Sequence, residues 1–196
     1  MKKEVAVEQF KFPSYQEIPA MGLYLKQVVN YINQCLAPLG NIKITSSMVS
    51  NYVKHDLIAS PEGRLYSREQ IATLLFIIIA KNVMDQEDLR KAIAIQQKTY
   101  STEVAYNYFA AELQNVLLYV FNKKKELQKI GHDNTSQKQM LRNVIMAFAY
   151  REYLYRKRPK LKYLKTPSCL VLRWGCLCIQ ILSAVCLCRF FPWQIS

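Results

Sequence analysis

The sequence predicts a mainly α-helical fold with one small β-hairpin, and three observations support this prediction. Apolar residues recur at helical spacing in several segments, and capping residues precede most of these segments. A single short stretch carries the turn residues of a hairpin. The chain has 196 residues, of which 51% are apolar and 21% charged, as is typical of a folded protein. We therefore expect one domain with a full hydrophobic core, or one small domain with an appendage.

The first element is an extended arm, followed by a helix. Residues 1–20 contain two prolines and isolated aromatic residues without periodicity, which predicts an extended N-terminal arm. Apolar residues then recur at helical spacing over residues 21–36, until Pro38 and Gly40 end the pattern. The spacing predicts a helix from about Met21 to Leu36.

A short second helix and a hairpin follow. The helix is expected to begin after Thr45 or Ser46, whose hydroxyls can accept a hydrogen bond from a first-turn amide. Pro61 and Gly63 then stand as turn residues between two apolar patches. This arrangement predicts a hairpin over residues 57–66.

The third helix is the most apolar segment of the first hundred residues. Ser67 and Gln70 fit a capping box, in which the two side chains satisfy backbone amides of a new helix. The run Ile71–Ala80 is apolar on nearly every face, so this helix is expected to be buried on all sides. It is too short to cross a bilayer. Asp85 is then suited to cap a fourth helix.

Two longer helices are predicted at the end of the folded part. An apolar stripe extends from Tyr106 to Phe121, and residues 131–134 break it. Ser136 and Gln139 suggest a further capping box before a helix over residues 137–156. Two amphipathic helices joined by a turn predict an antiparallel helical hairpin over residues 99–166.

The chain is strongly basic, with 27 Lys and Arg against 14 Asp and Glu and a net charge of +13. This surplus favours a polyanionic partner, either nucleic acid or an anionic membrane face. Residues 151–165 hold seven of the cations and one anion, interleaved with tyrosines. This basic end of the hairpin is suited to bind phosphate backbones, and the simpler alternative is a solvated helix end.

The sequence offers little catalytic chemistry. Its two histidines, His55 and His132, form no paired metal motif, and the chain lacks a serine elbow and a phosphate-cradling glycine loop. We expect that the protein is not an enzyme, and we expect no cofactor and no metal site.

The order of the elements points to DNA. A helix, a turn, a short polar helix, a hairpin and a capped buried helix together predict a winged helix-turn-helix. In that fold the second helix enters the major groove and the hairpin contacts the DNA backbone. The alternative is a helical protein-interaction module whose polar face is only solvated. The residues expected to face double-stranded DNA are Thr45, Ser46, Ser47, Ser50, Asn51 and Lys54 of the short helix and Arg64 of the hairpin.

Three stretches also carry a family resemblance. Over about residues 15–155 the chain resembles a bacterial family called domain of unknown function eighteen-thirty-six. That family is similar to the MerR-type winged helix, over residues 23–95 of this chain. The resemblance implies a MerR-like winged helix domain over residues 21–98 that serves as a transcription regulator. The three stretches are Leu23–Val28, Thr45–Lys54 and Arg64–Ile71.

The similarity to MerR proteins implies roles for individual residues. Tyr52 matches the second tyrosine of their Arg-Tyr-Tyr stretch, and Leu57 matches the leucine that follows it. Arg64 and Tyr66 match the Arg-x-Tyr pair of the wing, so contact with the DNA backbone is implied for these residues and for Tyr52.

The chain also departs from the MerR pattern. Ser50 and Asn51 replace the arginine and the first tyrosine, and Asp56 replaces a glycine, which removes one phosphate anchor and adds an anion. MerR-type regulators dimerise through a helix after the DNA-binding domain, which implies that the Tyr106–Phe121 stripe could form a homodimer. Alternatively, that stripe packs within its own chain.

The tail over residues 167–196 differs in composition from the rest. It holds five of the six cysteines and no acidic residue. A shifted reading frame or a non-native extension is the first interpretation. A C-terminal membrane anchor is the second, although placing the polar side chains of Arg173 and Gln180 inside a bilayer is unfavourable in free energy. Because Cys35 is the lone cysteine before the tail and the first residues lack a signal peptide, we expect a cytoplasmic protein.

Overall fold

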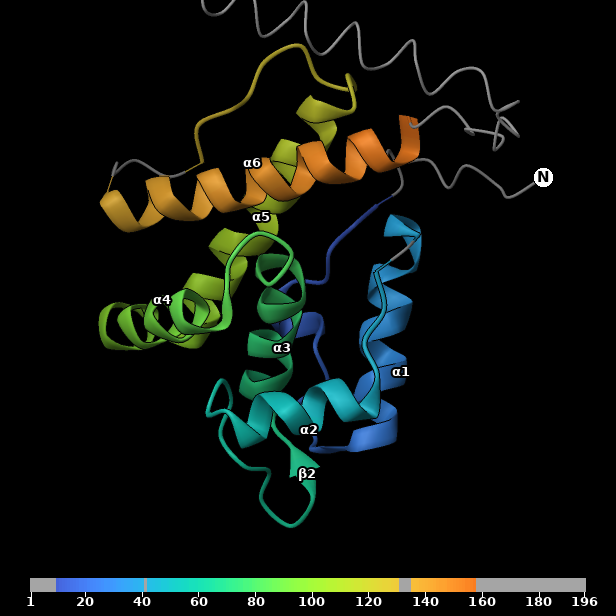
Figure 1. Ribbon diagram of the computed structural model, residues 1–196, viewed down its shortest axis with the longest axis vertical. Coiled ribbons are helices and arrows are strands. Elements are labelled where there is room, and N and C mark those ends of the chain that lie inside the picture. The colour runs from blue at the N-terminus through green and yellow to red at the C-terminus, as the bar shows by residue number, and fades with distance from the viewer. Residues whose placement is uncertain (1–9, 41, 131–134, 158–196) are drawn as a thin grey trace, which may run out of the picture. The chain divides into compact units, whose positions relative to one another are not determined.

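The structure, a computed structural model, describes residues 10–40, 42–130 and 135–157, and these residues form a mainly helical fold, as the sequence predicts (Figure 1). They belong to one unit that ends at Lys157. The predicted tail over 167–196 and the part of the basic end beyond residue 157 lie outside the described residues. The elements are η2 (Tyr15–Glu17), β1 (Leu23–Tyr24), α1 (Leu25–Leu36), η3 (Ala37–Leu39), α2 (Ser46–Lys54), β2 (Leu65–Tyr66), α3 (Arg68–Ala80), α4 (Gln86–Thr99), α5 (Thr102–Val120) and α6 (Ser136–Lys157).

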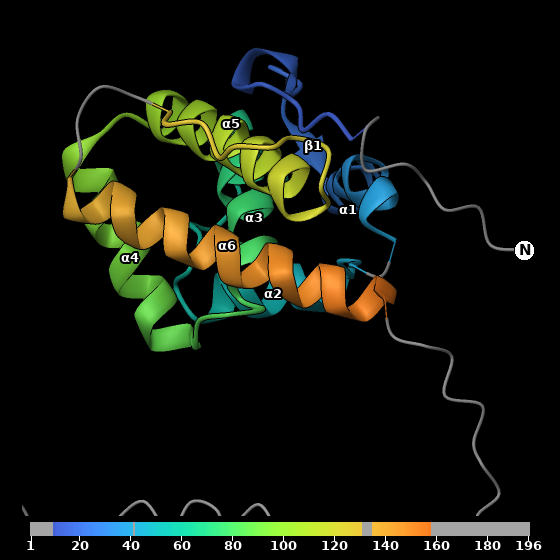
Figure 2. The same cartoon turned by 90° about the horizontal axis from the view of Figure 1, so that it is seen from above.

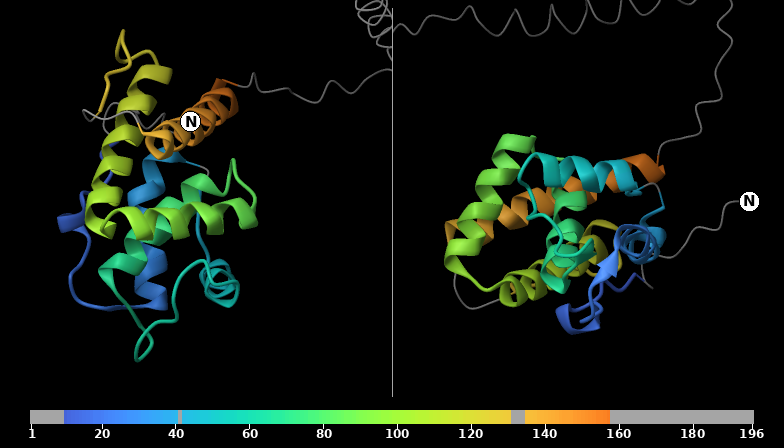
Figure 3. Two further views of the ribbon diagram at one scale, coloured as in Figure 1. Left: turned by 90° about the vertical axis from the view of Figure 1, so that its left-hand side faces the viewer. Right: turned by 90° about the horizontal axis from the view of Figure 1, so that it is seen from below.

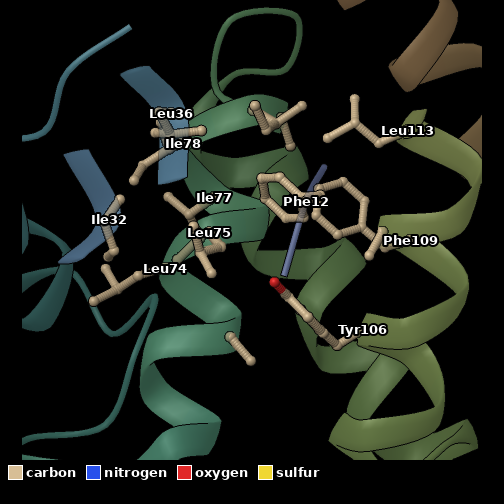
Figure 4. Packing of buried hydrophobic residues seen from close by; sticks show 14 of the residues in the cluster. Phe12, Ile32, Leu36, Leu74, Leu75, Ile77, Ile78, Tyr106, Phe109 and Leu113 are labelled. Carbon is tan, nitrogen blue, oxygen red and sulfur yellow. The ribbon is translucent and has the colours of Figure 1, made fainter. Parts of the chain in front are cut away.

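Helix α3 lies in the middle of the core. Eight of its residues are buried, which confirms the prediction of a helix covered on all sides. Ile32 and Leu36 of α1 lie on one side of it, and Phe109 and Leu113 of α5 lie on the other (Figure 4). Each fully buried leucine or isoleucine contributes about 1.5–3 kcal/mol to the free energy of folding. Among the described helices, none is long and apolar enough to cross a membrane.

The N-terminal segment packs against the core and is not a free arm. Phe10, Phe12, Tyr15 and Ile18 are buried. The ring of Phe12 meets the ring of Phe109 edge-on, with centroids 5.7 Å apart. Burial of these apolar side chains fixes a segment that lacks periodicity, which is why the sequence pattern did not reveal it.

Local capping chemistry fixes where several helices begin. Thr45 Oγ1 accepts a hydrogen bond from the Met48 amide at 3.3 Å, at the start of α2. Ser67 and Gln70 form the predicted capping box of α3, and Asp85 caps α4. These three predictions are confirmed.

The cap of α6 differs from the prediction by one residue. Thr135 Oγ1 accepts a hydrogen bond from the Lys138 amide at 3.4 Å. Ser136, which the sequence predicts as the capping residue, is the first residue of the helix and bonds to the Gln137 side chain. Hydroxyl residues stand at both positions, so the sequence pattern alone could not separate them.

The small sheet joins different strands from those predicted. Antiparallel pairing sets Leu23 opposite Tyr66 and Tyr24 opposite Leu65, so the helix predicted from Met21 begins only at Leu25. The predicted hairpin over residues 57–66 keeps one isolated bridge at its tip. Gly22 permits the close approach of the strands, since a Cβ there would lie 2.9 Å from the Leu65 Cβ.

Helices α5 and α6 run in the same direction, so the predicted antiparallel hairpin is wrong. Residues that come later in α5 contact residues that come later in α6. Figure 2 shows that the ribbons of both helices start at the same end. The apolar stripe of α5 is buried against α3 and α6 of its own chain. The contacting pairs are Tyr108 with Lys138, Glu112 with Arg142 and Phe121 with Tyr153.

The long connection between α5 and α6 allows the two helices to run in the same direction. The described part of residues 121–135 runs back along α5 before α6 begins. Asn115 Nδ2 donates to the Gln128 carbonyl at 2.8 Å, and Arg142 Nη2 donates to the same oxygen at 3.4 Å. An extended chain of this length reaches about 50 Å, more than the length of α5. Residues 131–134, predicted to break the helices, lie outside the described residues.

Candidate nucleic-acid interface

Helix α2 presents a polar face that contains no acidic residue. Its opposite side packs into the core through Val49 and Tyr52. Hydroxyl, amide and ammonium groups can bond to phosphate oxygens and base edges, so this face has the chemistry of a DNA-reading surface. The exposed residues are Thr45, Ser46, Ser47, Ser50, Asn51 and Lys54, all of which the sequence predicts as DNA-facing.

A tight turn carries Arg64 at its tip. The Leu65 amide donates to the Glu62 carbonyl at 2.8 Å, and the central residues Gly63 and Arg64 have φ of 53° and 67°. Two positive φ angles define a type I′ turn. For a non-glycine residue this conformation costs about 1–2 kcal/mol. Backbone preference alone would favour glycine or asparagine here, so the exposed arginine is a candidate functional residue.

The turn and α2 lie at the same end of the described unit, as Figures 1 and 3 show from several sides. Gln70 holds the chain between them against the start of α3. Its Nε2 donates to the carbonyls of Ala59 at 2.9 Å and Ser60 at 3.3 Å. The capping pattern identifies Gln70 as a helix cap, but nothing in the sequence reveals this second role.

Asn33 fixes the beginning of α2 relative to α1. Its Nδ2 donates to the Ile44 carbonyl at 3.0 Å, and its Oδ1 accepts from the Ile44 amide at 2.9 Å. The side chain therefore satisfies both backbone groups of Ile44, just before the Thr45 cap. Sequence reasoning missed this residue, because an asparagine within a helical segment gives no sign of a distant partner.

The end of α2 explains one departure from the MerR pattern. Asp56 has φ of 55°, its amide donates to the Val53 carbonyl, and the Leu57 amide donates to the Tyr52 carbonyl at 2.9 Å. This is a Schellman motif, in which glycine usually holds the left-handed position. Aspartate tolerates that position better than most residues, so Asp56 can replace the expected glycine. Leu57 is buried directly after it.

Tyr52 and Tyr66 lie in the core, which differs from their expected contact with the DNA backbone. Only 7% of Tyr52 and 5% of Tyr66 is exposed. Among the described residues the Tyr52 hydroxyl has no hydrogen-bond partner, and Lys81 Nζ lies 5.5 Å from the centre of its ring. Burial raises the pKa of the Tyr66 hydroxyl. Both rings therefore support α2 and β2 from within, because burial of an aromatic ring removes a large apolar surface from water.

Exposed charge at this end is modestly positive. Over residues 42–66 the exposed cations are Lys43, Lys54 and Arg64, against Asp56 and Glu62. The neighbouring Arg68 faces the N-terminal segment instead. Its Nε donates to the Ile18 carbonyl at 2.8 Å, so it does not add to this surface.

Metal chemistry is not evident in the part of the chain that the structure describes. No group of three or more histidine, cysteine, aspartate or glutamate residues is placed there to hold an ion. The five cysteines of the tail lie outside the described residues.

Comparison with known families identifies the segment that contains this surface. Residues 13–109 match the model of a domain of unknown function, DUF1836. The matched range includes α2, the Arg64 turn and all of α3, and it ends within α5, before the limit of 155 that the resemblance suggested. No curated protein and no solved structure matches the chain. The match covers 97 of the 196 residues of the chain, so this part of the chain is similar to the DUF1836 family.

Proposed function

We propose that this protein binds double-stranded DNA and regulates transcription, using α2 and the Glu62–Leu65 turn as a MerR-like winged helix-turn-helix. The observation that carries the proposal is the acid-free, exposed polar face of α2 at the same end of the unit as Arg64. Such a regulator would work in the cytoplasm, where bacterial DNA lies, and the MerR-like similarity extends the proposal to a homodimer.

Each part of the surface has a distinct task in this proposal. The small side chains of Ser46, Ser47 and Ser50 let the backbone of α2 come close to base edges. Asn51 can bond to an adenine with both groups of its amide, and Lys54 and Arg64 neutralise phosphates. The net charge of +13 draws the protein to DNA before specific contacts form.

Salt-dependent binding tests this proposal. The full chain is titrated into a fluorescently labelled random-sequence duplex, and anisotropy is measured at several salt concentrations. Lys54→Ala combined with Arg64→Asn is expected to weaken binding at least about tenfold, because two phosphate contacts are lost. The slope of log affinity against log salt should fall by about 2. Asparagine at residue 64 keeps the left-handed backbone, so the turn itself is preserved.

A second double variant controls for charge alone. Lys98→Ala with Lys129→Ala removes the same charge from exposed residues outside α2 and the turn, and it should leave the slope nearly unchanged. Tyr52→Phe should also bind as the parent does, because the lost hydroxyl is buried. The proposal is rejected if the full chain does not bind at low salt, or if both double variants bind equally well.

A further inference from the structure

The small sheet of β1 and β2 has an apolar face that points to water. Successive side chains of a strand point to opposite faces, so Leu23 with Tyr66 lies on one face and Tyr24 with Leu65 on the other. Tyr66 is buried, whereas Tyr24 is 57% exposed and Leu65 is 36% exposed. The inner pair therefore covers the core, and the outer pair exposes an aromatic and an aliphatic side chain.

Met21 extends this exposed surface along the chain. It is 75% exposed, the highest value among the large apolar residues that the structure describes. The next residue, Gly22, passes close to Leu65, because a Cβ at residue 22 would lie 2.9 Å from the Leu65 Cβ and 3.5 Å from its Cδ1. Three exposed apolar side chains thus lie within one short stretch of sheet. We call Met21, Tyr24 and Leu65 the apolar sheet face.

The apolar sheet face adjoins the candidate DNA surface. Leu65 directly follows Arg64, at the end of the unit that carries α2 (Figure 1). Lys26, two residues after Tyr24, is also exposed, and Glu62 is the one acidic residue of the turn. Cations and apolar side chains together suit a polyanion that has apolar parts of its own.

The size of the apolar sheet face favours a nucleic acid over a protein partner. Stable protein interfaces use about 20–30 residues and bury about 800 Å² on each partner. The other exposed large apolar residues of the described chain lie on α4, α5 and α6 or just before α4, away from the sheet. Along a DNA strand, phosphates alternate with deoxyribose rings, which lack the 2′-hydroxyl of ribose. A phosphate bound by Arg64 would bring such a ring to Leu65.

We propose that the apolar sheet face packs against the deoxyribose rings beside the phosphate that Arg64 contacts, and that it gives the protein a preference for DNA over RNA. A ribose at this place would bury its 2′-hydroxyl against Met21, Leu65 and the ring of Tyr24, which is unfavourable. The inference rests on the proposed DNA binding by α2 and the turn. It adds a part of the ligand that those residues do not contact.

Binding to two duplexes of one sequence tests the proposal on the full chain. Anisotropy compares a labelled DNA duplex with the RNA duplex of the same sequence at several salt concentrations. The triple variant Met21→Ser, Tyr24→Thr and Leu65→Thr should bind DNA about tenfold more weakly and bind RNA as the parent does, because apolar burial against deoxyribose is lost. Its slope of log affinity against log salt should stay that of the parent, since no charge has changed.

The substitutions are chosen to keep the sheet. Threonine is a good strand former, and at residue 24 it also suits the capping position of α1. The matched control, Val83→Thr with Ile95→Thr and Val104→Thr, removes three exposed apolar side chains outside the sheet and should bind both duplexes as the parent does. Tyr24→Phe should also bind normally, because the ring remains. Thermal unfolding verifies that each variant is folded.

The outcomes separate this proposal from the proposed function. If the parent binds DNA and the triple variant binds it equally well, the apolar sheet face has no such role, while DNA binding by α2 and the turn stands. The proposal is also overturned if the triple variant loses affinity for DNA and RNA equally. A dimer of the free protein that the triple variant dissociates would overturn it too, because a second copy would then cover the face. Absence of DNA binding by the parent at low salt would reject both proposals.

Discussion

Two buried carboxylates on neighbouring helices differ in their pairing. Glu112 of α5 is fully buried, and its ion pair with Arg142 includes a bond of 3.2 Å from Nη2 to Oε2. Glu152 of α6 is 3% exposed, with one oxygen 3.4 Å from Arg151 Nη1 and the other without a partner among the described residues. Burial raises the pKa of Glu152, and the charges of Arg151 and Arg156 only partly oppose this. The two residues should therefore respond in opposite ways to the same substitution.

Glu152→Gln should stabilise the protein at neutral pH. Because the pKa of Glu152 is higher in the folded state, the folded protein holds a proton that the unfolded chain has released. The free energy of unfolding of the parent should thus fall as pH rises from the ordinary carboxyl range through the raised pKa, and stay lower above it. The free energy of unfolding of the glutamine variant should not fall in this way. Urea unfolding at pH 4 and pH 7 measures the free energy of unfolding of both proteins, and the two values should differ little at pH 4.

Glu112→Gln is the matched comparison on the neighbouring helix. This substitution leaves the Arg142 guanidinium without its carboxylate partner, so we expect the free energy of unfolding at pH 7 to fall by about 2–3 kcal/mol. The partial exposure of Arg142 to water keeps the effect from being larger. If both substitutions lowered the free energy of unfolding equally, the anionic form of Glu152 would be stabilised in the folded protein, contrary to this argument.

At the scale of single elements, the placement of α2 depends on few contacts. The helix has nine residues, which is too short to be stable alone in water. Its cap and its Schellman motif fix its ends, but Asn33 ties its beginning to α1 through both backbone groups of Ile44. The role in DNA binding that we propose for α2 requires that this helix be held rigidly.

Asn33→Ala should lower the free energy of unfolding by about 2 kcal/mol, because two hydrogen bonds are lost and two backbone groups are left unpaired. Amide hydrogen exchange over residues 44–54 should also become faster than in the rest of the unit. Asn30→Ala, at an exposed position of the same helix, should change neither quantity. Similar effects of the two substitutions would contradict a specific role for Asn33.

The elements show what the sequence could predict and what it could not. Caps at Thr45, Ser67 and Asp85 depend on residues within one turn, so the local sequence is enough to place these helix starts. The directions of α5 and α6 depend on a long connection, which permits either orientation. The exposed residues of α2 follow from helical periodicity, whereas the burial of Tyr52 and Tyr66 depends on helices distant in the chain.

At the scale of the whole described unit, one core crosses the limit of the family match. The last matched residue, Phe109, meets Phe76 edge-on at 5.4 Å, inside the core. The rest of α5 and all of α6 lie beyond the match, yet they cover α3. Buried residues on both sides of the boundary predicted between residues 98 and 99 belong to this same core.

A chain shortened to residues 1–109 should therefore fail to fold cooperatively. It would expose the side of α3 that faces α5 and α6, and it would lose Leu113, Val116 and Phe148 from the core. Circular dichroism during heating should show no sharp transition, whereas a chain of residues 1–157 should unfold in one step. A cooperative transition in the shorter chain would show that the matched segment is independent.

The return of the chain between α5 and α6 affects the order of events during synthesis. When Val120 emerges from the ribosome, α6 has not yet emerged. At about 5–20 residues per second, translation of residues 121–157 takes about two to seven seconds. During that interval the nascent polypeptide displays apolar surface that its own last helix will later cover, so a chaperone that shields it should improve the yield of the newborn protein.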